Sequence, residues 1–194
     1  MLESLWNGVR MLQPGRGFRL GTDSVLLAEF LSLPANASVA DLGAGCGTLG
    51  LLLCARDPGC TVTGLELRES ACALAQENIT LNALSSRLSV RQGDVRGIAS
   101  YFPACSFDCV ISNPPYFPVG SGKVSEDAAV ARTELCLNLD ELCAAAGECS
   151  GIDTAHSGCA GVNPTSASML LFSVALMVVS KDWIHAETIF LSYG

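Results

Sequence analysis

The chain has 194 residues, of which 49% are hydrophobic and only 15% are charged. This length is sufficient for one α/β domain with a substantial core, and the composition excludes disorder as the default state. The formal net charge of -8, from 11 basic and 19 acidic side chains, argues against a general polyanion binder, because phosphate contacts need clustered Lys and Arg.

The N-terminal segment, residues 1–21, contains three arginines close together, Arg10, Arg16 and Arg19. They could form a local basic patch that contacts a substrate, although three arginines are more often a solvated face. No leader peptide is visible at the N-terminus, so we expect a cytoplasmic protein with reduced cysteines. The ten cysteines include no C-x-x-C pair and both histidines lie near the C-terminus, so no metal site is predicted.

Hydrophobic periodicity and turn residues predict alternating strands and helices. Thr22 or Asp23 can cap a first helix, which ends before Pro34. The elements predicted after it are a strand to Asp41, a helix to Arg56, a strand to Glu66, a helix over 70–81, a strand to Asp94, a strand to Ser112 and a helix from Asn138 through Ala146. This alternation predicts a Rossmann-like α/β fold, with a mostly parallel twisted sheet, helices on both faces and ligands beyond the carboxyl ends of the strands.

A glycine-rich turn, Asp41-Leu42-Gly43-Ala44-Gly45-Cys46-Gly47, follows the first predicted strand. Glycines at a strand-to-helix turn let a ligand approach the backbone, and the N-terminus of the helix offers free donors. The turn therefore predicts a nucleotide-type site. Gly45, Gly47 and Gly50 also fit the G-x-G-x-x-G spacing of dinucleotide-binding folds, although that match taken alone is weak.

Acidic residues stand at the ends of the next two predicted strands, Glu66 and Asp94. Glu66 suits a pair of ribose hydroxyls, because a carboxylate accepts two hydrogen bonds. With Asp41 before the glycines, these acids favour S-adenosylmethionine, since a nicotinamide cofactor would leave Asp94 without an evident task. Each acid could instead be an ordinary cap.

The turn Asn113-Pro114-Pro115-Tyr116 directly follows the last predicted strand. Two prolines fix φ and remove backbone donors, so the side-chain carbonyl of Asn113 and the backbone carbonyl of Pro114 are acceptors on a stiff turn. Tyr116 adds a ring face for stacking. An amide or exocyclic amine held in this way could receive a methyl group, whereas a plain Asn-Pro turn would only begin a loop.

Residues from about Gly21 to Gly147 resemble a class I, Rossmann-like S-adenosylmethionine-dependent methyltransferase of the small-domain type, and within it the bacterial tRNA adenine-N6 methyltransferases. The resemblance rests on four motifs, Phe18 to Asp23, Asp41 to Gly47, Asn113 to Phe117 and Ala131 to Glu134. The last motif has Thr133 where the family usually has a histidine.

The resemblance also implies roles for individual residues. It places Asp41, Gly43, Ala44 and Gly45 against the methionine part of S-adenosylmethionine, Glu66 on its ribose, and Asp94 with Val95 on its adenine. Asn113 would lie beside the cofactor. With Pro114 and Tyr116 it would also hold the target base of a tRNA. We expect a methyltransferase domain over 1–147 and an atypical tail over 148–194, in which no family resemblance is seen and the C-terminal strands are missing or altered.

The tail contains an apolar run, Met169 to Val179, which at eleven residues is too short to span a membrane and predicts a strand or a short helix. Three functions remain open. Beside a tRNA adenine-N6 methyltransferase, the same four-residue turn would serve a release-factor glutamine N5-methyltransferase, although the start Gly21-Thr22-Asp23 favours the RNA enzyme. The third is an inactive cofactor-binding domain with an altered C-terminus.

Overall fold

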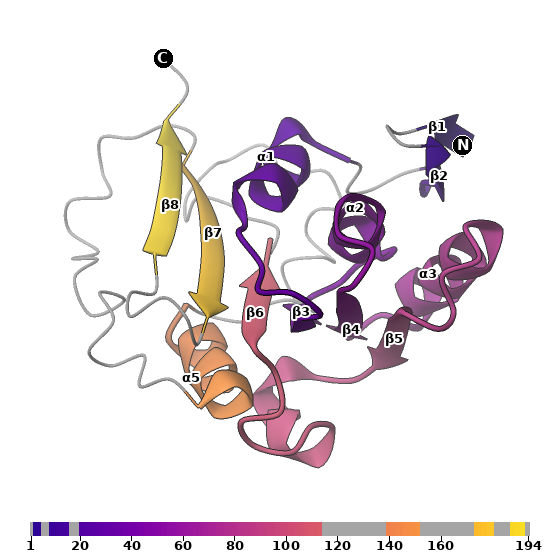
Figure 1. Cartoon of the computed structure of the whole chain (residues 1–194). Coiled ribbons are helices and arrows are strands. Elements are labelled where there is room, and N and C mark those ends of the chain that lie inside the picture. The colour runs from indigo at the N-terminus through magenta and orange to yellow at the C-terminus, as the bar shows by residue number, and fades with distance from the viewer. Residues whose placement is uncertain are drawn as a thin grey trace, which may run out of the picture.

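The computed structural model of the chain describes residues 2–4, 8–15, 20–113, 139–151, 173–180 and 187–192. Two sheets are present, a hairpin of β1 (Leu2–Ser4) and β2 (Arg10–Leu12) and a six-stranded sheet in the order β5-β4-β3-β6-β7-β8 (Figure 1). The strands of the larger sheet are β3 (Ser38–Leu42), β4 (Thr61–Glu66), β5 (Leu88–Gln92), β6 (Cys109–Ser112), β7 (Ser173–Ser180) and β8 (Glu187–Ser192). The helices are α1 (Thr22–Phe30), α2 (Thr48–Arg56), α3 (Glu69–Leu81), the 3₁₀ helix η2 (Val95–Ser100) and α5 (Leu139–Ser150).

Helices cover both faces of the four parallel strands β3, β4, β5 and β6, with α1, α2 and α3 on one face and η2 and α5 on the other (Figure 1). Alternate residues of the central strands enter two separate cores. Val39 and Ile111 belong to the core under α1 and α2, whereas Ala40 and Val110 belong to the core under η2 and α5. The central strands β3 and β6 are buried on both faces, which is the pattern of a parallel sheet. The predicted Rossmann-like fold class is confirmed.

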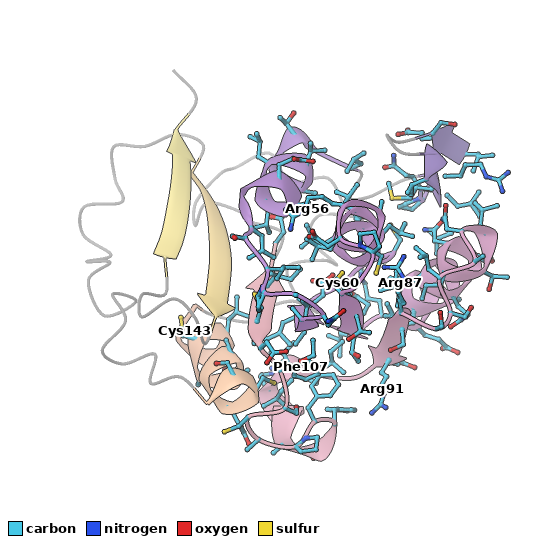
Figure 2. All side chains as sticks on the ribbon, viewed as in Figure 1. Arg56, Cys60, Arg87, Arg91, Phe107 and Cys143 are labelled. Carbon is cyan, nitrogen blue, oxygen red and sulfur yellow. The ribbon has the colours of Figure 1, made fainter. Side chains whose placement is uncertain are left out.

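Side chains from each core can be followed in Figure 2. Cys60, directly before β4, is fully buried in the core of α1, α2 and α3. Phe107 and Cys143 lie in the other core, where Phe107 meets Phe102 edge to face with ring centroids 5.1 Å apart (Figure 2). The guanidinium of Arg56 connects α2 to α1, because it donates to the carbonyl of Ala28.

Several predicted element ends differ from the structure, two of them by a single residue, since β3 runs to Leu42 and α3 begins at Glu69. Helix α1 has Gly21 as its N-cap and no side-chain cap, so the predicted cap by Thr22 or Asp23 is wrong; glycine is itself tolerated at this position. Strand β5 ends at Gln92, and Asp94 lies beyond it as the N-cap of η2. Helix α5 continues past Ala146 to Ser150 and ends before Gly151, whose φ of +73° is the left-handed conformation common after a helix.

The C-terminal strands extend the sheet with reversed direction. Strand β7 pairs antiparallel with β6 from Cys109 opposite Ser180 to Ser112 opposite Met177, and β8 pairs antiparallel with β7. The apolar run near residue 170 thus contains a strand, one of the two alternatives predicted. In the described part of the chain, β7 is the strand beside β6. That the tail departs from the family arrangement stays a prediction.

The N-terminal hairpin is fastened to α3 by two asparagines one helical turn apart. The Asn78 side chain accepts from the Leu12 amide at 2.6 Å and donates to the Leu12 carbonyl at 3.0 Å. Asn82 makes the same pair of bonds with Arg10, at 2.9 and 2.6 Å. Each side-chain amide therefore replaces the peptide of a neighbouring strand, which satisfies an edge that would otherwise be unpaired.

The expected basic patch is described only in part. The Arg10 guanidinium donates to the carbonyl of Leu81 in the last turn of α3 at 3.3 Å. Arg16 and Arg19 lie outside the described residues, so the patch stays a prediction. In the described ranges no helix is long and apolar enough to cross a membrane, no cluster of His, Cys, Asp or Glu is arranged to hold a metal ion, and none of the eight described cysteines is in a disulfide bond.

Candidate functional site

The glycine turn and Asn113, two parts of the predicted site, follow β3 and β6, which are neighbouring parallel strands. Asp41 pairs with Ile111, and the Ser112 hydroxyl donates to the Leu42 carbonyl at 2.6 Å. Asn113 therefore leaves the sheet beside Gly43. The strand order also reverses between β3 and β6, since the chain runs outward to β4 and β5 and then returns to the other side of β3 (Figure 1). Ligands of open α/β sheets bind in the crevice at such a reversal.

The glycine turn after β3 provides an open backbone surface. Gly43, Gly45 and Gly47 have φ of 81°, 57° and 82°, left-handed values that side chains rarely allow. The amide of Gly43 is held by the carbonyl of Leu65 on β4 at 2.8 Å, which fixes the course of the turn. A Cβ placed on Gly43 or Gly45 would meet no described atom within 4 Å. This turn can accept a ligand directly against its backbone.

Two other glycines have a packing role instead. A Cβ on Gly50, inside α2, would lie 2.4 Å from Cδ1 of Leu88, and one on Gly64 would lie 2.6 Å from the Cβ of Ala44. Gly50 therefore brings α2 close to β5, and Gly64 lets the glycine turn lie against β4. Gly50, the third glycine of the G-x-G-x-x-G spacing, serves close packing of the helix on the sheet, which is also its role in dinucleotide-binding folds, so the spacing alone does not distinguish the two cofactors.

Asp41 has a buried carboxylate with one oxygen, Oδ1, that receives no hydrogen bond from the described residues. Its residue is only 2% exposed, and no described group donates to its Oδ1. Burial, and after it the charge of Glu66, raises the pKa of Asp41 from 3.8 to about 7. Buried acceptors without partners are rare in folded proteins, and the N–H of a ligand would satisfy this one. The group fits the expected contact with the methionine part of a cofactor.

Glu66 is equally buried, at 2% exposure, but both oxygens of its carboxylate accept hydrogen bonds. Oε2 accepts from the Gly45 amide at 2.8 Å, and Oε1 accepts from both the backbone amide and Nε of Arg68 at 3.0 Å. The side chain thus connects the glycine turn with the N-terminus of α3. Asp41 and Glu66 lie near the ends of the adjacent strands β3 and β4, and the charge of Glu66 raises the pKa of Asp41.

Asp94 combines the two roles that the sequence left open. As the N-cap of η2 it accepts from the Arg96 amide at 2.9 Å, and it also accepts from Nε of Arg96 at 2.9 Å. The hydrogen bond from the Arg96 side chain lowers the pKa of Asp94. Val95 beside it is buried, while Asp94 is 35% exposed. The carboxylate can therefore cap the helix and still face a ligand at the sheet edge.

Asn113 is oriented by a residue that the sequence did not single out. Its Nδ2 donates to the hydroxyl of Ser24 in α1 at 3.0 Å, and Ser24 is buried. Because the amide nitrogen is directed to Ser24, the carbonyl Oδ1 is the end left for a ligand. Ser24 directly follows the Gly21 to Asp23 motif, which was the signal in the sequence. Pro114, Tyr116 and the motif at Ala131 to Glu134 lie outside the described residues.

The arginine partners of the two acids were also missed. The sequence contains the same pattern twice, Glu66-Leu67-Arg68 and Asp94-Val95-Arg96, and in both places the arginine amide and guanidinium bind the acid two residues earlier. This acid-x-Arg repeat could have been noticed in the sequence. Together the described groups form an edge with an open glycine turn, one unpartnered carboxylate oxygen, two arginine-bound acids and one side-chain carbonyl.

Comparisons with known proteins agree with this geometry. The family described as "Methyltransferase small domain" matches residues 18–133. A tRNA1(Val) (adenine(37)-N6)-methyltransferase from Citrobacter koseri is 34% identical over 134 residues, which is 68% of this chain and 54% of that protein. A protein of the same name from Porphyromonas gingivalis is 32% identical over 142 residues, which is 70% of this chain and 56% of that protein. The chain thus spans about half the length of these curated relatives.

Two further matches extend the comparison. A protein of the same name from Shewanella is 28% identical over 172 residues, which is 88% of this chain and 72% of that protein. A match of this extent cannot fit within residues 1–147, so it reaches into the tail in which the sequence alone showed no resemblance. A solved structure, a predicted O-methyltransferase from Agrobacterium tumefaciens, is 28% identical with a TM-score of 0.44, over 57% of this chain and 54% of that one. From the family match over 18–133, the chain belongs to the methyltransferase small domain family.

Proposed function

We propose that this protein is an S-adenosylmethionine-dependent N-methyltransferase that methylates the exocyclic N6 of an adenine in tRNA. One observation supports it above the others: the glycine turn and Asn113 leave neighbouring strands at the same edge, joined by the bond from Ser112 to Leu42. A methyl donor on the first and an amine on the second would then meet in one crevice. The names of the curated relatives support tRNA as the substrate class.

The donor groups of the site fit S-adenosylmethionine, which when bound would supply an electrophilic methyl group on a sulfonium. The unpartnered Oδ1 of Asp41 suits the ammonium group of its methionine part, and the open turn suits close approach of the ligand. The residues proposed to hold the cofactor are Asp41, Gly43, Ala44 and Gly45 for methionine, Glu66 for ribose, Asp94 and Val95 for adenine, and Asn113 beside them. We place the catalytic unit in residues 1–147, with residues 1–21 near the substrate.

The residues after β6 position the nucleophile. The exocyclic nitrogen of adenine is a weak nucleophile, because its lone pair is delocalised into the ring. Oδ1 of Asn113 and the carbonyl of Pro114 would accept its two hydrogens and direct the lone pair at the methyl group. Positioning of this kind can contribute ~7 kcal/mol or more without a strong general base. The base must leave its stack, and Tyr116 would compensate by stacking on it. No metal takes part, and a tRNA substrate places the activity in the cytoplasm.

A transfer assay tests the substrate class. Labelled S-adenosylmethionine is incubated with the protein and bulk tRNA, a release factor, or no acceptor. We expect label in tRNA, recovered as N6-methyladenosine after digestion. Label in a glutamine of the release factor would instead support the protein methyltransferase. Binding of S-adenosylhomocysteine without transfer to either acceptor would indicate an inactive cofactor-binding domain.

Ser24→Ala is expected to lower kcat about tenfold and to leave the affinity for S-adenosylhomocysteine unchanged, because the free amide of Asn113 can turn its Oδ1 away from the amine. Single-turnover transfer to tRNA and calorimetric binding measure the two effects. Leu26→Ala, an exposed change on the same helix, is the control. An unaltered kcat in the serine variant would show that the contact with Asn113 has no part in positioning.

A further inference from the structure

Arg68 occupies the place on Glu66 that a ribose would need. A carboxylate oxygen accepts about two hydrogen bonds. Oε1 of Glu66 already has two, from the amide and Nε of Arg68, and Oε2 has one, from the amide of Gly45. One acceptor position remains on this buried carboxylate, whereas the two hydroxyls of a ribose would each need one.

Only one of the three bonds can be given up. The Gly45 amide belongs to the glycine turn, which is fixed by the bonds of Gly43 and Ala44 to the Leu65 carbonyl. The Arg68 amide belongs to the N-cap residue of α3, whose carbonyl is held by the amides of Ala71 and Cys72. The Arg68 guanidinium is the end of a long side chain that is 35% exposed, so it can move into water while the backbone stays.

We propose that Arg68 is a positioning residue that competes with the ribose for Glu66, so that its guanidinium must leave Oε1 before a nucleoside ligand is fully held. This inference rests on the proposed function, since it assumes that Glu66 receives the ribose. In the free protein, Arg68 keeps the buried carboxylate paired and correctly directed. In the complex, two ribose hydroxyls replace one guanidinium bond, and the cost of breaking the ion pair lowers the affinity.

The second acid-x-Arg pair shows why Arg68 is the more important of the two. Asp94 is 35% exposed, so water can occupy its acceptor positions when Arg96 moves, and the exchange costs little. Glu66 is 2% exposed, so water does not supply donors to its two oxygens and only the protein or a ligand can fill their acceptor positions. Competition for acceptors is therefore strong at Glu66 and weak at Asp94.

The test measures binding of three probes by the full chain at pH 8. Arg68→Ala is expected to bind S-adenosylhomocysteine and adenosine about fivefold more tightly than the wild type, because the partly exposed ion pair between Arg68 and Glu66 no longer has to break. The gain should be absent with 2′,3′-dideoxyadenosine, which lacks both hydroxyls. Arg68→Lys, which keeps a donor for Glu66, should resemble the wild type.

Arg91→Ala is the matched control, because Arg91 is an exposed arginine that donates to the carbonyl of Tyr101 at 3.3 Å and is not a partner of Glu66. If Arg68→Ala does not fold, Arg68→Gln provides the same comparison. Unchanged or weaker binding of adenosine by the Arg68 variants, or an equal gain with the dideoxy probe, overturns the inference while the proposed function stands. A wild type that binds neither S-adenosylhomocysteine nor adenosine overturns both.

Discussion

Replacing Asn113 by alanine is expected to abolish methyl transfer to tRNA while the affinity for S-adenosylhomocysteine stays within a few fold. The substitution removes Oδ1, the acceptor proposed to hold the target amine, but it leaves the glycine turn, Asp41 and Glu66 intact. Since positioning supplies most of the proposed rate enhancement, its loss should be close to complete. Label transfer under single-turnover conditions and calorimetric binding of S-adenosylhomocysteine measure the two quantities.

Two variants make this result specific. Asn113→Asp keeps an acceptor at the same place and can accept from the Ser24 hydroxyl, so we expect it to retain part of the activity. Gln92→Ala removes a side-chain amide at the same edge of the sheet, on β5, where it donates to the Leu67 carbonyl, and should transfer at the wild-type rate. If the alanine variant of Asn113 retained its turnover, the proposed grip on the target nitrogen would be excluded.

The parallel part of the fold could be predicted because its signals are local. The runs that became β3, β4 and β6 are short, apolar and followed by glycine, acidic or proline turns, and their alternation with helices permits few topologies. The N-terminal hairpin gave no such signal. Its strands have three residues each, and its second strand is held by Asn78 and Asn82, about 70 residues away in the sequence.

The direction of the C-terminal strands was equally inaccessible. An apolar run near residue 170 predicts a buried element, but hydrophobicity is the same whether a strand runs parallel or antiparallel to β6. The direction of β7 is a property of the sheet edge that it joins. The end of α5 was misplaced for a different reason. Gly147 lies inside the helix, and Gly151 is the glycine that follows its last turn.

At the site, the sequence predicted residue types but not their partners. Strand ends located Asp41, Glu66 and Asn113 at one edge, and the strand register agrees. The bond from Asn113 to Ser24 joins residues 89 positions apart, and the turn of Arg68 back onto Glu66 depends on the conformation of a long side chain. Such contacts depend on how side chains pack in the folded protein. The hydrophobic periodicity of the sequence does not predict them.

Replacing Asp41 by asparagine is expected to stabilise the unliganded protein at pH 8. The pKa of Asp41 is about 7 in the folded protein and 3.8 when unperturbed, so between these values the folded state binds more protons than the unfolded state. Stability therefore falls as the pH rises from about 4 to about 7 and stays low above it. The difference corresponds to on the order of 4 kcal/mol. We expect asparagine to recover about 1–3 kcal/mol of it, since a buried amide needs partners of its own.

Urea unfolding at pH 4 and pH 8 measures this effect, and the gain should be present only at the higher pH. Asp108→Asn is the matched control, because the Asp108 carboxylate accepts from the amide and hydroxyl of Ser38 at 2.9 and 2.7 Å and its loss should destabilise the protein. The asparagine at position 41 should also weaken binding of S-adenosylhomocysteine, whose ammonium loses a charged acceptor. A variant that is less stable at pH 8, or equally stabilised at both pH values, would contradict this account. A carboxylate that destabilises the free fold is expected only where a ligand compensates for it, so stability and affinity should change in opposite directions at Asp41.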